Sequence, residues 1–218
     1  MNFTVLILGS DINAYYMARS YHEAFGKVVD MYGKDFLGVT KFSKIISFTK
    51  VPELGNSDNF VSTLNTYAQN SKFEKILLIA TSDSWARLLV ENKEKLSDKF
   101  VYNYPNLDLL NKLLVKENFY NTFSGVLDIP KTFIYSCIEK FGLEYHKHHF
   151  EGQAKVYKMK SFEELKKVVG QVEESGYKDN LIIQEFIPGG DEGLCDVMMY
   201  ANSRGEVELA TFAQIGLQ

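Results

Sequence analysis

Continuous apolar runs alternate with helically spaced apolar stripes in the first half of the chain. The run at residues 4–8 stops at residues 9–11, and the stripe that follows ends at Gly26. A second run, at residues 75–80, is followed by a helix expected over 84–92. Apolar strands separated by amphipathic helices predict an α/β fold with a parallel sheet covered on both faces. A further strand is expected at 28–32 and a further helix at 59–70.

The pattern changes in the second half of the chain. Ser161 and Glu164 form a capping box that predicts a helix from there to about residue 175. The Asn202–Gly205 turn separates two runs that read as a β-hairpin, 196–200 and 206–212. We therefore place a boundary near residue 125, with an α/β domain before it and an α+β domain after it. The other expected elements are a helix over 109–123 and strands at 133–135, 154–159 and 181–187.

Composition narrows the classes of protein that this chain can represent. Among the 218 residues 45% are hydrophobic and the formal net charge is −4, which favours a folded protein without a broad nucleic-acid-binding face. The two cysteines, Cys137 and Cys195, lack metal-site spacing and read as reduced thiols. No signal peptide and no apolar run of roughly 20 residues is present, so we expect a cytoplasmic protein without membrane insertion.

Polar turns follow two of the expected strands at the edge where open parallel sheets bind ligands. One is Gly9, Ser10 and Asp11, and the other is Thr81, Ser82 and Asp83. Backbone amides at such turns can hold a carboxylate or a phosphate near a helix N-terminus. A ligand site and a simple tight turn both fit this pattern, and the glycines do not match a dinucleotide fingerprint.

Two other stretches, in the second half of the chain, are candidates for metal binding or nucleotide binding. His146, His148 and His149 lack a carboxylate or thiolate at ligand spacing, so a solvated loop is favoured over a metal site. Residues 182–192 join a buried strand to a Pro-Gly-Gly turn followed by acids. Such a hinge can present backbone groups to a flat base, but without a family context it is only a strand and a turn. No nucleophile–base constellation is identified, so the catalytic residues stay unassigned.

In their shared order, several segments resemble the ATP-grasp superfamily, most closely the D-aspartate ligases and related carboxylate–amine ligases of bacterial cell-wall synthesis. The likeness extends over nearly the whole chain. The segments are 7–11 (ILGSD), 18–21 (ARSY), 41–45 (KFSKI), 113–120 (LLVKENFY), 129–132 (IPKT), 149–156 (HFEGQAKV) and 184–190 (QEFIPGG).

The resemblance implies a Rossmann-like pre-ATP-grasp domain at 1–125 and an ATP-grasp small subdomain at 126–190. Residues 191–218 would begin a large subdomain that is incomplete. ATP and Mg²⁺ are the implied cofactors. The partners would be a small-molecule amino acid and an amine acceptor. The enzyme would transfer the ATP γ-phosphate to the carboxylate of D-aspartate, and a peptidoglycan-precursor amine would attack the resulting acyl phosphate.

Site roles follow from the same resemblance. Lys116 would approach the nucleotide phosphates, and Gly152, Gln153 and Lys155 would belong to the loop that closes over them. The hinge would hold adenine, and Asp191 or Glu192 would contact the ribose. The adenine residues are Glu185, Phe186 and Ile187, and the acceptor-side residues are Gly9, Ser10, Asp11, Ser82 and Asp83.

The sequence departs from the family pattern at two places. A strand with a phosphate-binding lysine normally precedes the flexible loop, but only residues 137–147 occupy that interval. The magnesium-binding carboxylates and Asn follow the hinge in the family, and we expect none within this chain. A truncated ligase with weak or absent turnover is the first hypothesis. A non-catalytic small-molecule or partner-binding protein is the alternative, and a dinucleotide-dependent oxidoreductase rests on the first strand–turn–helix alone.

Overall fold

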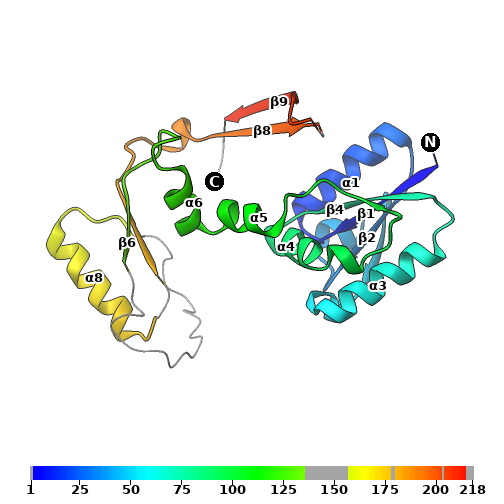
Figure 1. The fold of residues 1–218 in the computed structure, drawn as a ribbon, viewed down its shortest axis with the longest axis horizontal. Coiled ribbons are helices and arrows are strands. Elements are labelled where there is room, and N and C mark those ends of the chain that lie inside the picture. Colours follow the sequence, from blue (N-terminus) through cyan, green and yellow to red (C-terminus); the bar gives the residue numbers. More distant parts are fainter. Residues whose placement is uncertain (1, 136–156, 178–179, 203, 215–218) are drawn as a thin grey trace. The chain divides into compact units, whose positions relative to one another are not determined.

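A computed structural model describes residues 2–135, 157–177, 180–202 and 204–214. Contacts divide the chain into two compact units, Met1–Thr122 and Phe123–Gln218. Each unit has its own sheet or sheets, and each is described below by itself (Figure 1).

Five parallel strands form the sheet of the first unit in the order β3-β2-β1-β4-β5. From β1, the strands β2 and β3 extend the sheet to one edge. Strand β4 then pairs with the other side of β1. Every neighbouring pair is parallel, which confirms the expected α/β fold with a parallel sheet. The strands are β1 (Phe3–Leu8), β2 (Val29–Gly33), β3 (Ile46–Lys50), β4 (Lys75–Ala80) and β5 (Phe100–Val101).

Alternate side chains of β1 supply two separate cores. Leu6 and Leu8 pack into one cluster, and Val5 and Ile7 pack into the other. All four are fully buried, which explains why the strand is apolar at every position.

Helices cover the two faces of this sheet (Figure 1). Helix α1 (Ile12–Phe25) packs on the Val5 side, whereas α3 (Ser57–Asn70) and α4 (Asp83–Glu91) pack on the Leu6 side. Helix α1 ends at Gly26, which adopts the left-handed conformation expected of a C-terminal glycine. Three short elements complete this part: α2 (Gly38–Lys41), η1 (Pro52–Gly55) and η2 (Lys93–Lys95).

The single helix expected over 109–123 is wrong, because two helices occupy this stretch. Helix α5 (Leu107–Leu114) begins after the Asn106 cap, and α6 (Lys116–Phe123) follows. Val115 separates them with an extended backbone, at φ −82° and ψ 111°. Apolar periodicity continues through the break, so the sequence pattern did not show it.

The second unit contains an antiparallel pair and a helix. Strand β6 (Thr132–Tyr135) pairs with β7 (Leu181–Gln184), and α8 (Phe162–Glu174) lies between them in sequence. Ser161 caps α8 as expected, since its Oγ accepts from the Glu164 amide at 3.2 Å, while the Glu164 carboxylate accepts from the Lys160 amide.

Two strand expectations in the second unit need correction. The strand expected over 181–187 ends at Gln184, before the hinge residues. Residues 157–159 do not form a strand, and the rest of the strand expected at 154–159 lies outside the described residues.

The expected hairpin is confirmed as β8 (Cys195–Ala201) and β9 (Val207–Gln214), which follow the short turn η3 (Asp191–Gly193). Val197 pairs with Phe212, whereas Tyr200 pairs with Leu209 on the opposite face. All four side chains are more than half exposed, so both faces of the ribbon present apolar groups.

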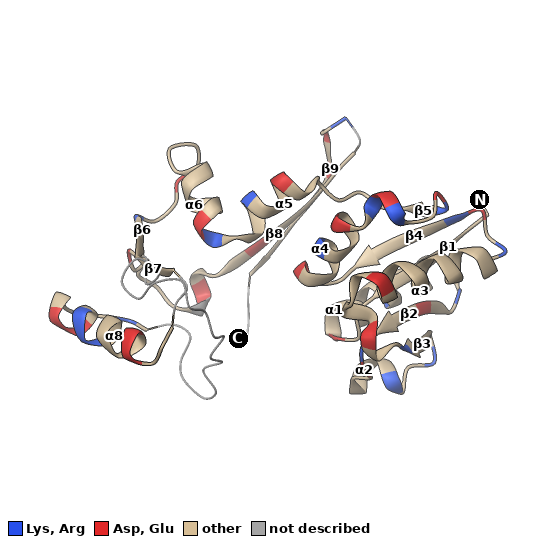
Figure 2. Cartoon of the chain, turned by 60° about the horizontal axis from the view of Figure 1, so that its bottom comes forward, with Lys and Arg blue, Asp and Glu red and all other residues tan. Residues whose placement is uncertain are grey.

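Charges of both signs are interspersed along α8 and over the helices of the first unit (Figure 2). Among the residues that the structure describes, no helix combines the length and the apolarity that crossing a bilayer requires.

Buried tyrosines make the first unit sensitive to alkaline pH. Burial raises the pKa of Tyr67, and a 2.6 Å hydrogen bond to the Asp30 carboxylate adds to the shift. Because the folded state disfavours the phenolate, the stability from Tyr67 is present below the ordinary pKa of 10.0 and is lost as pH rises above it. The pKa of Tyr104 is raised by burial in the same direction.

We expect Tyr67→Phe to reduce the loss of unfolding free energy between about pH 9 and about pH 11. At neutral pH the variant loses about 1 kcal/mol with the hydrogen bond. Urea unfolding followed by the fluorescence of Trp85, the single tryptophan, measures both effects. Tyr16→Phe, at an exposed ring, is the control. An unchanged pH dependence in Tyr67→Phe contradicts the assignment.

Candidate active site at the sheet edge and the hinge

The carboxyl ends of β1 and β4 form the point at which the strand order reverses. These two strands are hydrogen-bonded neighbours from Phe3↔Lys75 to Leu8↔Ala80. The turn after β1 leads to α1 on one face, and the turn after β4 leads to α4 on the other. In open parallel sheets, ligands bind in the crevice outside such a point.

Gly9 begins the first turn in a conformation that only glycine adopts easily. Its φ is 138°, and its amide donates to the Tyr32 carbonyl at 2.9 Å. A Cβ atom built on Gly9 would overlap the Oγ1 of Thr81. The absent side chain therefore allows the turns after β1 and β4 to lie against each other.

Thr81 joins these two turns through hydrogen bonds. Its amide and its hydroxyl both donate to the Leu8 carbonyl, at 3.1 and 2.8 Å. The sequence placed Thr81 in this turn and assigned a substrate role to Ser82 and Asp83, whereas Thr81 makes the contact with the β1 turn. Only the pairing of strands far apart in the chain reveals its role.

Asp11 and Ser82 are helix N-caps. An Asp11 carboxylate oxygen accepts from the Ala14 amide at 3.0 Å, while Ser82 Oγ accepts from the Trp85 amide at 3.5 Å. Asp83 is exposed in the first turn of α4. The N-termini of α1 and α4 therefore follow neighbouring strands, and each carries an acidic side chain in or next to its first turn.

Thr40 supports this site, although the sequence pattern gave no signal for it. The side chain is buried in α2, and its hydroxyl lies 3.1 Å from the Ser10 carbonyl and 3.0 Å from the Leu37 carbonyl. Ser10 is thus fixed through its backbone, and its partly exposed side chain is left for other contacts.

The hinge of the second unit begins where β7 ends. The Glu185 amide donates to the Lys131 carbonyl at 2.9 Å, and its carboxylate lies 3.4 Å from the Lys131 amide. Phe186 and Ile187 are exposed and outside regular structure. Among the described residues, the amides of Phe186 and Ile187 have no hydrogen-bond partner. The hinge therefore presents free backbone donors beside an aromatic ring.

Lys158 is a hinge neighbour that sequence reasoning missed. Its ammonium lies 3.5 Å from the centroid of the Phe186 ring, which is a cation–π contact. The contact joins a residue before α8 to one after β7, so local patterns do not reveal it.

The acidic turn after the hinge folds back on itself. Glu192 accepts from the Gly190 amide at 3.2 Å, and Gly189 adopts a φ of 136°. Asp191 begins η3, and the structure describes its backbone alone. Of the two acids expected at the ribose, Glu192 thus already has a backbone partner.

Other expected site residues are exposed or undescribed. Lys116 is an exposed side chain at the first position of α6. Gly152, Gln153 and Lys155 lie outside the described residues, as do the three histidines of the 146–149 cluster. Within the described part of the chain, no group of three or more His, Cys, Asp or Glu residues is arranged to hold a metal ion.

Comparisons with known proteins show where similar sequences and folds occur. The chain is 31% identical to D-aspartate ligase of Enterococcus faecium (strain Aus0004), in an alignment of 231 residues that covers 95% of this chain and 55% of that protein. The crystal structure of L-amino acid ligase from Bacillus licheniformis matches with a TM-score of 0.60 at 11% identity, over 97% of this chain and 50% of that chain. No family model matches. The chain thus spans about half the length of each of these proteins, and the structural match shows a shared fold.

Gly9→Ala tests the packing of the two turns. We expect the free energy of unfolding to fall by about 3 kcal/mol, because the substitution adds backbone strain and an overlap with Thr81. Gly38→Ala is the matched control, since a Cβ atom there meets nothing within 4 Å. Urea unfolding compares both variants with the parent chain. A loss at Gly9 no larger than that at Gly38 contradicts the close packing.

Proposed function

Because this chain is a relative of the ATP-grasp carboxylate–amine ligases, we propose that it carries the amino-acid and adenine portions of an ATP-dependent ligase. The similarity to D-aspartate ligase over 95% of the chain is the observation that carries the proposal. The turns after β1 and β4 would receive the amino acid, and the hinge after β7 would receive the nucleotide base.

The first site has the charge pattern that a zwitterionic amino acid requires. The N-terminal ends of α1 and α4 favour a carboxylate, because their free amides and helix dipoles are positive. One oxygen of Asp11 caps α1, and the other has no hydrogen-bond partner among the described residues. That oxygen would accept from the substrate ammonium, with Asp83, which follows the neighbouring strand β4, as a second acidic group.

The hinge has the groups that a purine base requires. The free amides of Phe186 and Ile187 would donate to ring nitrogens of adenine, and the exposed Phe186 ring offers an apolar surface. Lys116, together with Gly152, Gln153 and Lys155, would approach the phosphates. Asp191 or Glu192 would contact the ribose, since the Gly190 amide engages one carboxylate oxygen of Glu192 and leaves the other.

The proposed chemistry is acyl-phosphate formation followed by amide formation. A carboxylate oxygen of the amino acid, proposed as D-aspartate, attacks the γ-phosphorus of ATP and releases ADP. The amine of a peptidoglycan precursor then attacks the acyl carbon and displaces inorganic phosphate. Cationic side chains favour the first step because negative charge develops on the transferring group.

Magnesium would neutralise phosphate charge in such a reaction. The described residues do not hold a cluster of acidic side chains that fits the ion, so we assign no ligand and no step to it.

ATP titration of the full chain tests the nucleotide part of the proposal. We expect ATP to raise the melting temperature, because a ligand that binds the folded state alone stabilises it. Lys116→Ala should weaken ATP binding by about tenfold or more, as expected for loss of a charge-assisted contact. Lys112→Ala is the control, since the Lys112 side chain is 45% exposed and pairs with Asp108 on its own helix. Equal ATP affinity in both variants removes Lys116 from the site. If ATP leaves the melting temperature unchanged while an amino acid binds, the chain is better described as a non-catalytic binding protein.

Asp11 variants separate helix capping from substrate binding. Asp11→Asn keeps a capping oxygen, so its unfolding free energy should stay within about 0.5 kcal/mol of the parent, whereas Asp11→Ala loses about 1 kcal/mol. Both variants should bind D-aspartate about tenfold or more weakly, because both lose the charge that faces the ammonium. Calorimetric titration with D-aspartate measures this effect. Parent affinity in Asp11→Asn would leave Asp11 as a helix cap alone.

A further inference from the structure

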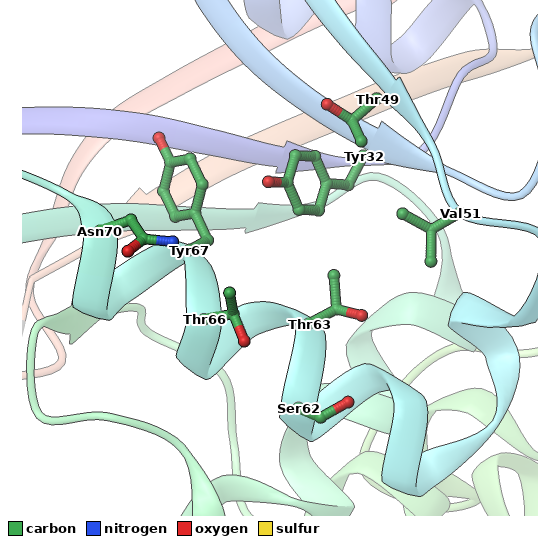
Figure 3. A pocket seen from close by; sticks show the side chains of 8 residues that line it. All are labelled: Tyr32, Thr49, Val51, Ser62, Thr63, Thr66, Tyr67 and Asn70. Atoms are coloured by element: carbon green, nitrogen blue, oxygen red, sulfur yellow. The ribbon is translucent and has the colours of Figure 1, made fainter.

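A groove of about 350 Å³ lies between α3 and the carboxyl halves of β2 and β3 (Figure 3). It lies on the face that α3 covers, whereas the turn at Gly9 leads to α1 on the opposite face. The lining residues are Tyr32, Thr49, Val51, Ser62, Thr63, Thr66, Tyr67 and Asn70.

The polar lining of the groove comes from the solvent-facing side of α3 and from the ends of β2 and β3. Helix α3 buries Phe60, Leu64 and Ala68 along one stripe against the apolar core. The neighbouring stripe, from Thr63 through Thr66 to Asn70, faces the groove with hydroxyl and amide groups (Figure 3). Opposite it, the edge strand β3 presents Thr49, and β2 presents Tyr32.

Several groups in the groove are available to a ligand. Within the described part of the chain, the side chains of Thr63, Thr66 and Asn70 form no hydrogen bonds. The Tyr32 and Tyr67 rings meet edge to face, with centroids 5.6 Å apart. Tyr67 is held in place by its 2.6 Å hydrogen bond to Asp30. Two fixed rings and a row of free hydroxyl and amide groups therefore face one space.

We propose that this groove binds a neutral polyhydroxylated ligand, with a single sugar ring as the chemical class. None of its eight lining residues is charged, which disfavours an ionic ligand. Hydroxyl and amide side chains can both donate to and accept from sugar hydroxyls. The tyrosine rings would pack against the C–H face of the ring. The volume lies at the small end of ligand pockets, as one ring requires.

Sugar binding in the groove does not depend on the proposed ligase function, so the test uses no nucleotide. Amide chemical shifts of the isotopically labelled full chain would be followed during titration with D-glucose and with N-acetyl-D-glucosamine. Saturable shifts at Tyr32, Thr66 and Tyr67 are expected. D-glucuronate and D-glucosamine, which carry opposite charges, should bind more weakly than the neutral sugars.

The double variant Thr63→Val/Thr66→Val removes two free hydroxyls while keeping the side-chain shape. We expect it to bind about tenfold or more weakly, because each lost hydrogen bond costs affinity. Ser47→Ala is the matched control, because Ser47 is exposed on β3 but does not line the groove. Absence of saturable shifts at millimolar neutral sugar overturns the proposal. Parent affinity in the double variant, or tighter binding of a charged sugar, also overturns it.

Discussion

The pairing of β1 with β4 is the constraint on which the first unit depends. It joins strands that are about seventy residues apart, and the Leu8 carbonyl completes it by accepting both donors of Thr81. This pairing allows the adjacent turns to touch only because Gly9 has no side chain. The same pairing brings the N-termini of α1 and α4 to neighbouring strands. Strand order, turn geometry and the placement of the candidate site are thus consequences of one contact.

Much of the first unit could be predicted from sequence because its central strands are buried on both faces. Residues such as Val5 and Leu6 are apolar without alternation, and Asp11 and Ser82 stand where helices begin. Element ends were harder to predict, because the Val115 break and the end of β7 at Gln184 interrupt patterns that continue in the sequence.

The site was predicted less completely than the fold, for a physical reason. Asp11 and Ser82 could be proposed because polar residues after an apolar strand have a local signature. Thr40 and Lys158, and the contact of Thr81 with Leu8, were missed because the partners lie far away in the chain. The groove was missed for a different reason, since the polar stripe of α3 has the pattern of any helix face in contact with water.

The β8–β9 ribbon has a consequence for the behaviour of this polypeptide in solution. Two strands alone leave both outer edges with unpaired backbone groups, and side chains such as Phe212 and Met198 are about two-thirds exposed. Open edges combined with apolar faces favour strand addition from another molecule. Among the described elements, the ribbon is therefore where strand addition from another molecule would begin.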